Sequence, residues 1–262
     1  MSIETKEKQN IKINGSGAAG GGSYEDVKIN GSGAILGDIE CQLLKIDGSG
    51  KVEGNVKSDS IKFNGSAKIE GDTNTSYMKI NGSATLEGNV VVNELIVNGS
   101  GKFKKDLQVV DFEVNGGSHV NGRVTGGAVK VNGELKVDES CEVEQFRSNG
   151  SIKIKGLLSA DSIELNIGHH SLAKEIGGEK IVVKQYGSSS LLKHIINFFK
   201  KRVDLLESDL IEGDEVNLAV TKAKLVRGKN VVIGDKCEID RVEYTNSITI
   251  DPNAKVGASV KL

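Results

Sequence analysis

A short motif returns at a fixed interval through most of the chain, and this recurrence limits the possible fold more than any other feature. The motif is an apolar residue followed by Asn-Gly, usually Ser, and a small residue, as in Ile80-Asn81-Gly82-Ser83-Ala84. Equivalent segments begin at a constant step along the chain, at Ile29, Ile46, Phe63, Ile80, Val97, Val114, Val131, Ser148 and Leu165. A short fixed period, here about 17 residues, is typical of a solenoid, in which each repeat packs only on its neighbours.

The apolar positions within the repeat predict short strands. If the apolar residue before Asn-Gly is position 1, then positions 7 and 16 are also apolar, position 11 is mostly apolar and position 5 is small. Apolar pairs two residues apart, such as Leu44 with Ile46 and Ile61 with Phe63, place alternate side chains on one face of a strand. Three such strands per repeat predict an all-β fold, a β-helix of about 17 residues per coil.

The Asn-Gly pair is predicted to form a corner of each coil. Asn and Gly both tolerate the left-handed backbone region that a sharp bend requires. We expect the stacked Asn side chains to hydrogen-bond their neighbours in adjacent coils. Five of these segments, and an earlier copy at Asn14-Gly15-Ser16, match the Asn-Gly-Ser glycosylation pattern. The charged start of the chain lacks a secretion signal, so the corner interpretation is favoured.

Charged residues follow the same period on the predicted outer face. Lys51 and Glu53 recur one repeat later as Lys68 and Glu70, at positions 6 and 8. A lysine column beside a glutamate column offsets the repulsion between like charges. We interpret these columns as a solvated face.

The composition excludes several classes of function. A net charge of −2 gives no reason to expect a nucleic-acid partner. We find no phosphate-binding loop, no cluster of metal ligands and no convergent catalytic residues, so we predict no enzyme activity, no cofactor, no metal and no small-molecule substrate. The adjacent His169 and His170 point to opposite sides of an extended strand and would chelate a metal poorly.

The three cysteines are widely separated, at Cys41, Cys141 and Cys237. They occupy positions of the repeat that are predicted to point inward, where a thiol behaves as a small apolar group. Three buried free thiols fit a reducing cytoplasm.

One segment changes from the strand period to the helix period. From residue 190 to 206, Leu192, Ile195, Ile196, Phe199, Val203 and Leu206 share one face at helical spacing. Two roles stay open for this amphipathic helix. The favoured one is packing against the β-helix; the other is contact with a membrane surface or a protein partner through Ile195, Phe198, Phe199, Lys200, Lys201 and Arg202.

The repeat resumes after the helix, since Ile233 and Ile250 are again one full period apart. The predicted organisation is a disordered tail over 1–10, regular coils over 11–187, a helical insertion over 188–208 and further coils over 209–262. An uncapped final coil is a template for strand addition. The candidate self-association surface is therefore formed by Ile248, Ile250, Ala254, Val256 and Val260.

The repeat resembles that of a known family. The phrases Asp47-Gly48-Ser49-Gly50-Lys51-Val52-Glu53-Gly54-Asn55-Val56 and Val231-Val232-Ile233-Gly234-Asp235-Lys236-Cys237-Glu238-Ile239 are similar to the repeats of the bactofilins, bacterial polymer-forming cytoskeletal proteins. The resemblance implies a right-handed β-helix that polymerises end to end without nucleotide and serves as a cytoplasmic scaffold. This chain departs from the family in its extra coils, its predicted helix and its lack of an apolar N-terminal membrane-targeting segment.

We therefore predict a self-associating scaffold whose main partner is a second copy of itself. The cytoplasm is the expected location, and the helix leaves association with a membrane open. The alternative is a monomeric or dimeric β-helix that binds a partner or membrane surface through the helix. A β-helix acyltransferase or carbohydrate-active enzyme is a less favoured alternative.

Overall fold

Each repeat of the sequence forms one coil of a parallel β-solenoid. In a regular coil, the four-residue strand β4 (Ser49–Val52) is followed by a turn and the eight-residue strand β5 (Val56–Phe63). β4 pairs in parallel with β6 (Ser66–Ile69), and β5 pairs with β7 (Thr73–Ile80), each residue facing its equivalent one repeat later. The predicted all-β solenoid, with one repeat of about 17 residues in each coil, is confirmed.

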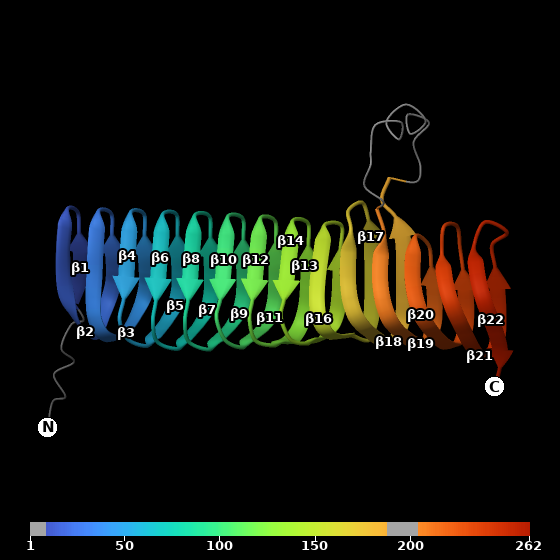
Figure 1. Cartoon of the computed structure of the whole chain (residues 1–262). Coiled ribbons are helices and arrows are strands. Elements are labelled where there is room, and N and C mark those ends of the chain that lie inside the picture. The colour runs from blue at the N-terminus through green and yellow to red at the C-terminus, as the bar shows by residue number, and fades with distance from the viewer. Residues whose placement is uncertain (1–8, 188–203) are drawn as a thin grey trace, which may run out of the picture. The chain divides into compact units, whose positions relative to one another are not determined.

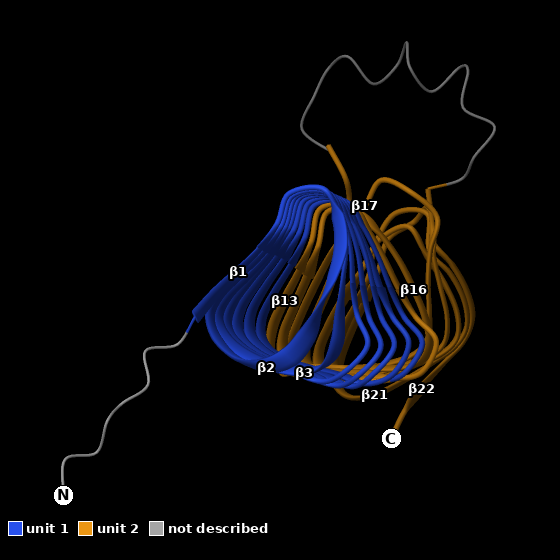
Figure 2. Cartoon of the chain, turned by 90° about the vertical axis from the view of Figure 1, so that its left-hand side faces the viewer, with its two compact units in different colours: residues 1–122 blue, residues 123–262 orange. Residues whose placement is uncertain are grey.

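The structure is a computed structural model that describes residues 9–187 and 204–262. Every regular element in these ranges is a β-strand (Figure 1). The chain divides into two compact units, residues 1–122 and 123–262, coloured separately in Figure 2. Strands of each unit wrap coil upon coil around buried side chains.

Unit 1 begins with three longer or irregular strands and then alternates short and long strands. The strands are β1 (Gln9–Ile13), β2 (Ser16–Ile29), β3 (Ser32–Ile46), β4, β5, β6, β7, β8 (Ser83–Leu86), β9 (Val90–Val97), β10 (Ser100–Phe103), β11 (Leu107–Val114) and β12 (Gly117–Val120).

Unit 2 keeps this alternation at first and ends in longer strands. The strands are β13 (Val124–Val131), β14 (Glu134–Val137), β15 (Cys141–Ser148), β16 (Ser151–Ser159), β17 (Ser162–Ile167), β18 (Ser171–Gln185), β19 (Leu206–Leu218), β20 (Thr221–Ile233), β21 (Glu238–Ile250) and β22 (Lys255–Lys261). The predicted extra strand at Ile181-Val182-Val183 is the end of β18.

The core consists of columns of side chains that stack along each unit. In the coil from Ile80 to Leu95, positions 1, 5, 7, 11 and 16 are buried, as the period predicts; the residues are Ile80, Ala84, Leu86, Val90 and Leu95. Position 13 forms a sixth buried column, which includes Cys41, Ser58, Thr75, Val92 and Val109. Because side chains of the same column lie about 4.8 Å apart, each apolar residue packs on its equivalents in the neighbouring coils.

The long strand of each coil bends once. In β5, the alternation of buried and exposed residues breaks at Asp59 and Ser60, neither of which is buried. The same break occurs in β7 and β9. Each regular coil therefore has three straight segments, as predicted.

The predicted helix lies between β18 and β19. Residues 188–203 are outside the described part of the chain, so Ile195, Phe198, Phe199, Lys200, Lys201 and Arg202 are not placed. β18 pairs directly with β19, with Ser171 opposite Leu206 and Ile181 opposite Val216. Leu206, expected as the last helical residue, begins β19 and is fully buried.

Other predicted boundaries differ by a few residues. The C-terminal strands begin at Leu206 rather than at about residue 209, and Gln9 and Asn10, expected in the tail, belong to β1. The step between coils is also shorter from β19 to β20, where Leu206 pairs with Thr221. The regular period returns where Val231 pairs with Ile248, as the sequence predicts.

Candidate functional site

The Asn side chains of the repeat form a hydrogen-bonded ladder at one corner of each unit. In unit 1, Asn81 donates its side-chain N–H to Asn64 Oδ1 at 2.8 Å, and Asn98 donates to Asn81 Oδ1 at 2.8 Å. Asn115 likewise donates to Asn98 at 3.0 Å. In unit 2, Asn149 donates to Asn132 at 3.3 Å and Asn166 donates to Asn149 at 2.8 Å. The expected stacking of Asn side chains is confirmed.

Gly82, which follows Asn81 in the ladder, is required for a reason that differs from the prediction. The described glycines with positive φ are Gly22, Gly37, Gly126 and Gly187, and none of them follows a ladder Asn. Instead, a Cβ at Gly82 would overlap the carbonyl oxygen of Gly65 in the preceding coil. The predicted left-handed backbone is therefore wrong, and the constraint is close stacking of one coil on the next.

A second polar ladder lies at another corner and was missed in the sequence. The backbone N–H of Asn55 donates to Asp38 Oδ1 at 2.7 Å, and that of Asp72 donates to Asn55 Oδ1 at 2.8 Å. Asn89 N–H in turn donates to Asp72 Oδ1 at 2.7 Å. The sequence does contain a pattern that could have predicted this ladder: a second dipeptide, Gly followed by Asp or Asn, recurs with the period of the repeat.

The predicted lysine and glutamate columns form a charge ladder on the outer face of unit 1. Lys51 Nζ lies 2.8 Å from Glu53 and 3.2 Å from Glu70 in the next coil. Lys68 Nζ lies 3.1 Å from Glu70. Hydrogen bonds from Lys68 and Lys51 lower the pKa of Glu70. Since these groups are exposed, the ladder contributes modestly to stability and more to a soluble, charge-balanced face.

The five residues proposed for self-association all lie on the last two strands, β21 and β22, or in the turn between them. Ile250 is 40% exposed, and Ile248, Ala254, Val256 and Val260 are half-buried. The same columns one coil earlier are covered, since Val231 is 1% and Ile233 0% exposed. β22 pairs with β21 along one edge, and no described strand pairs with its other edge. The structure thus brings these five residues together at one partly exposed coil.

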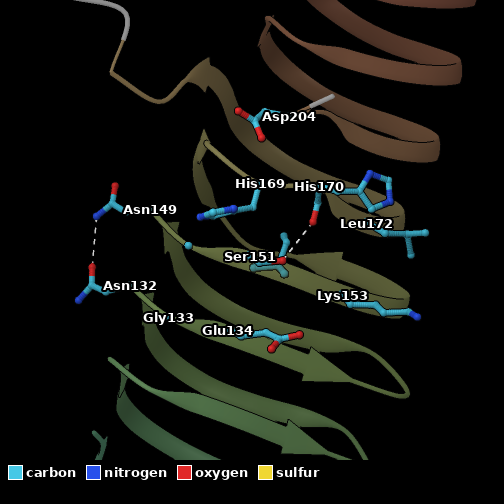
Figure 3. A pocket seen from close by; sticks show the side chains of 12 residues that line it. Asn132, Gly133, Glu134, Asn149, Ser151, Lys153, His169, His170, Leu172 and Asp204 are labelled. Carbon is cyan, nitrogen blue, oxygen red and sulfur yellow. Dashed lines mark hydrogen bonds between the residues drawn. The ribbon is translucent and has the colours of Figure 1, made fainter. Parts of the chain in front are cut away.

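A groove of about 690 Å³ in unit 2 lies where the repeat becomes irregular. It is lined by Asn132, Asn149, Ser151, Lys153, His169, His170 and Asp204, among others (Figure 3). The rings of His169 and His170 point away from each other in Figure 3. In the described part of the chain, no three His, Cys, Asp or Glu side chains gather as a metal site would require.

The three cysteines are free and buried, as predicted. Burial raises the pKa of the Cys141 thiol to about 12, and burial also raises the pKa of Cys237. Thiols with raised pKa values are poor nucleophiles at neutral pH, so Cys141 and Cys237 act as core residues.

Comparisons with known proteins bear on the first third of the chain. The family model "Bactofilin: Polymer-forming cytoskeletal" matches residues 2–91. Over these residues, the chain is similar to the bactofilin family. The matched segment covers the first coils of unit 1, including the Lys51–Glu70 charge ladder and the Asn64–Asn81 step of the Asn ladder. The description of this family is polymer-forming and cytoskeletal, which agrees with the prediction that the chain is not an enzyme.

Two curated relatives come from Bacillus subtilis (strain 168). Uncharacterized protein YhbF is 39% identical over 101 residues, which are 38% of this chain and 39% of the relative. Uncharacterized protein YhbE is 42% identical over 101 residues, which are 38% of this chain and 40% of the relative. The match to this chain thus spans about two-fifths of either relative. No solved structure matches the chain significantly.

The described residues contain no helix that is long and apolar enough to cross a bilayer.

Proposed function

We propose that this chain is a non-enzymatic scaffold that self-associates through an end of its β-solenoid, without nucleotide. The family description supplies the class, a polymer-forming cytoskeletal protein. The single observation that carries the proposal is the loss of cover over the apolar columns at β21 and β22. Ile250 is 40% exposed, whereas Ile233 in the same column is fully buried.

Backbone chemistry favours the same surface. The outer edge of β22 presents N–H and C=O groups that no described strand satisfies. A parallel strand from a second copy would satisfy them and would cover the half-exposed Val256 and Val260. Burying one coil end covers a small area for a stable dimer, so stacking along a filament is the setting in which such contacts become strong. We also propose the right-handed coil of the family and a cytoplasmic location, which the three free thiols support.

A charge placed in one of these columns tests the proposal. Val256→Lys puts an ammonium group where a neighbouring copy would have to bury it, so assembly should be lost. Thr249→Lys is a matched control, because Thr249 is exposed on the adjacent strand and points away from the columns. Loss of sedimenting assemblies in Val256→Lys but not in Thr249→Lys supports the proposal. Equal assembly in both variants rejects this surface.

A further inference from the structure

Charged side chains alternate in sign from coil to coil on one outward face of unit 2. The face is formed by two residues from each of four consecutive strands, β18 to β21, which pair in parallel register. Both residues of each row point outward, because the residue between them is buried. The charge of the rows is positive, negative, positive and negative in turn. The rows are Leu172 with Lys174, Glu207 with Asp209, Lys222 with Lys224, and Glu238 with Asp240.

Some charges on this face are already neutralised within the chain, and four are not. Lys224 Nζ lies 2.7 Å from Asp209, and Lys255 Nζ in the last coil lies 2.9 Å from Glu238. The side chains of the other four form no ion pair and no hydrogen bond with any described residue. They are at least partly exposed and border one groove of about 460 Å³. These unpaired groups are two lysines and two acids, Lys174, Lys222, Glu207 and Asp240.

A second copy of the same face would supply the missing partners. We consider two copies face to face, related by a two-fold axis that runs parallel to the strands and between β19 and β20. The axis reverses the order of the rows, so β19 faces β20 of the second copy and β18 faces its β21. Glu207 then lies opposite Lys222 of the second copy, and Lys174 lies opposite Asp240 of the second copy. Because the arrangement is symmetric, each of these contacts occurs twice.

We propose that this face of unit 2 pairs two copies of the chain side by side through these ion pairs. Each unpaired charge meets an unpaired charge of opposite sign, which is the observation that selects this arrangement. The match ends one coil further out, where Lys153 would approach Lys255 of the second copy, whose charge Glu238 already offsets. The pairing is lateral and is therefore distinct from the end association proposed above.

The contact is small, so the pairing of two isolated chains is weak. Four coils at about 4.8 Å and five residues at about 3.3 Å give roughly 300 Å² per copy, well below the ~800 Å² of a stable interface. Exposed ion pairs are individually weak and are screened by salt. Pairing should therefore appear at high protein concentration and low salt. A filament that repeats the face would strengthen the pairing through multivalency.

Zero-length carbodiimide crosslinking of the full chain, followed by peptide mapping, tests the proposal. This reagent joins an amine to a carboxylate only where the two are in contact. Within one chain Lys174 and Asp240 lie three coils apart, about 14 Å, which is more than the two side chains can bridge. A link between them therefore joins two copies. We expect this link at low salt and its loss at high salt.

The same experiment contains its own positive control. Lys224 and Asp209 are 2.7 Å apart within one chain, so they should be linked under all conditions in which the reagent works. A link between Lys224 and Asp209 without one between Lys174 and Asp240 would overturn the proposal. End association does not produce the second link, because Lys174 on β18 lies four coils before β22. The two proposals therefore fail separately.

Charge reversal separates this contact from general charge effects. Lys174→Glu and Asp240→Lys should each reduce the crosslinked dimer band several-fold, because like charges then meet. An equal mixture of the two variants should restore the band, since one contact of each mixed pair is native and the other has both charges reversed. Lys62→Glu, at an exposed lysine of unit 1 outside this face, is the control that should keep the band.

Unchanged bands in both single variants, or no recovery in the mixture, would contradict the proposal. Circular dichroism shows whether each variant has kept its fold. If a variant does not fold, the link between Lys174 and Asp240 in the unaltered chain still decides the proposal.

Discussion

Ile239 and Val256 face each other in parallel register on β21 and β22, yet Ile239 is 2% exposed and Val256 is only half-buried. The same contrast separates Val231 from Ile248, its register partner one coil later. Both pairs belong to inward columns and consist of apolar residues. The difference in exposure therefore arises because no further described coil covers Ile248 and Val256. The apolar core of unit 2 is therefore partly uncovered at its last described coil.

The inward columns hold the solenoid together, and one charge within them should unfold it. Ile80 is fully buried between Phe63 and Val97 in its column. We expect Ile80→Asp to cost at least about 3 kcal/mol, because the carboxylate has no partner in the stack. Val91→Asp is the control, since Val91 is 40% exposed and should cost less than about 1 kcal/mol. Thermal melts followed by circular dichroism measure both, and equal melting temperatures would show that the column assignment is wrong.

The close stacking at the Asn-Gly corner makes a specific demand on glycine. Gly82→Ala should destabilise the chain by about 1–3 kcal/mol, because the new methyl group overlaps the Gly65 carbonyl oxygen. Gly117→Ala adds the same methyl group where no atom lies within 4 Å, so its effect should stay within about 1 kcal/mol. Chemical denaturation compares the two variants, and a Gly117→Ala loss as large as that of Gly82→Ala would refute the stacking explanation.

The buried thiol of Cys141 should make stability fall at alkaline pH. Its pKa rises from 9.0 to about 12 on folding because of burial, so the folded state keeps the proton that the unfolded state loses. This contribution is complete below pH 9 and is lost as the pH rises toward 12. In Cys141→Ala, the decline of unfolding free energy over this window should be less steep than in the unaltered chain. Parallel slopes would contradict the assigned pKa shift.

The segment between β18 and β19 should be dispensable for the coils. Since Ser171 and Ile181 pair directly with Leu206 and Val216, the strands on either side already stack. Replacing residues 188–203 with a short Gly/Ser bridge should leave the far-ultraviolet spectrum and cooperative melting intact. The deletion must stop before Leu206, which is fully buried in β19.

The role of the segment itself is tested separately by flotation with anionic liposomes. The sequence prediction favours packing over membrane contact, so the intact chain should remain in the dense fraction of the gradient and should not float with the liposomes. Flotation of the intact chain that disappears in the double variant Phe198→Ser/Phe199→Ser would overturn this preference in favour of a membrane-binding helix.

Much of the fold could be predicted from the sequence, because each inward position carries the same kind of side chain in successive coils. Ile233 and Ile250 could be assigned to one column from spacing alone, and the structure pairs them. The function of Gly82 could not be read this way, because its constraint comes from a carbonyl in the neighbouring coil. A sequence pattern shows which residues recur. It does not show why glycine is needed at a given position, because that reason lies in how closely the backbones of neighbouring coils approach each other.

The second polar ladder was not predicted from the sequence, and neither was the hydrogen bond that the Gly150 N–H donates to the Ser148 hydroxyl. The two reasons are related. Asp38, Asn55 and Asp72 share the period of the repeat, but the alternation of Asp with Asn hides their common role as acceptors of backbone N–H groups. At Gly150, a single serine at position 1 changes the hydrogen bonding of the corner. This change can be predicted only if the Ser148 hydroxyl is known to be buried beside Gly150.

The central claim is that the chain assembles through a solenoid end without nucleotide. Sedimentation velocity over a range of protein concentration and salt, with negative-stain microscopy of the same samples, tests it most directly. We predict assemblies that grow with concentration and appear as filaments without added nucleotide or metal. A chain that sediments as a monomer at every concentration and salt, with no filaments visible, would contradict the account.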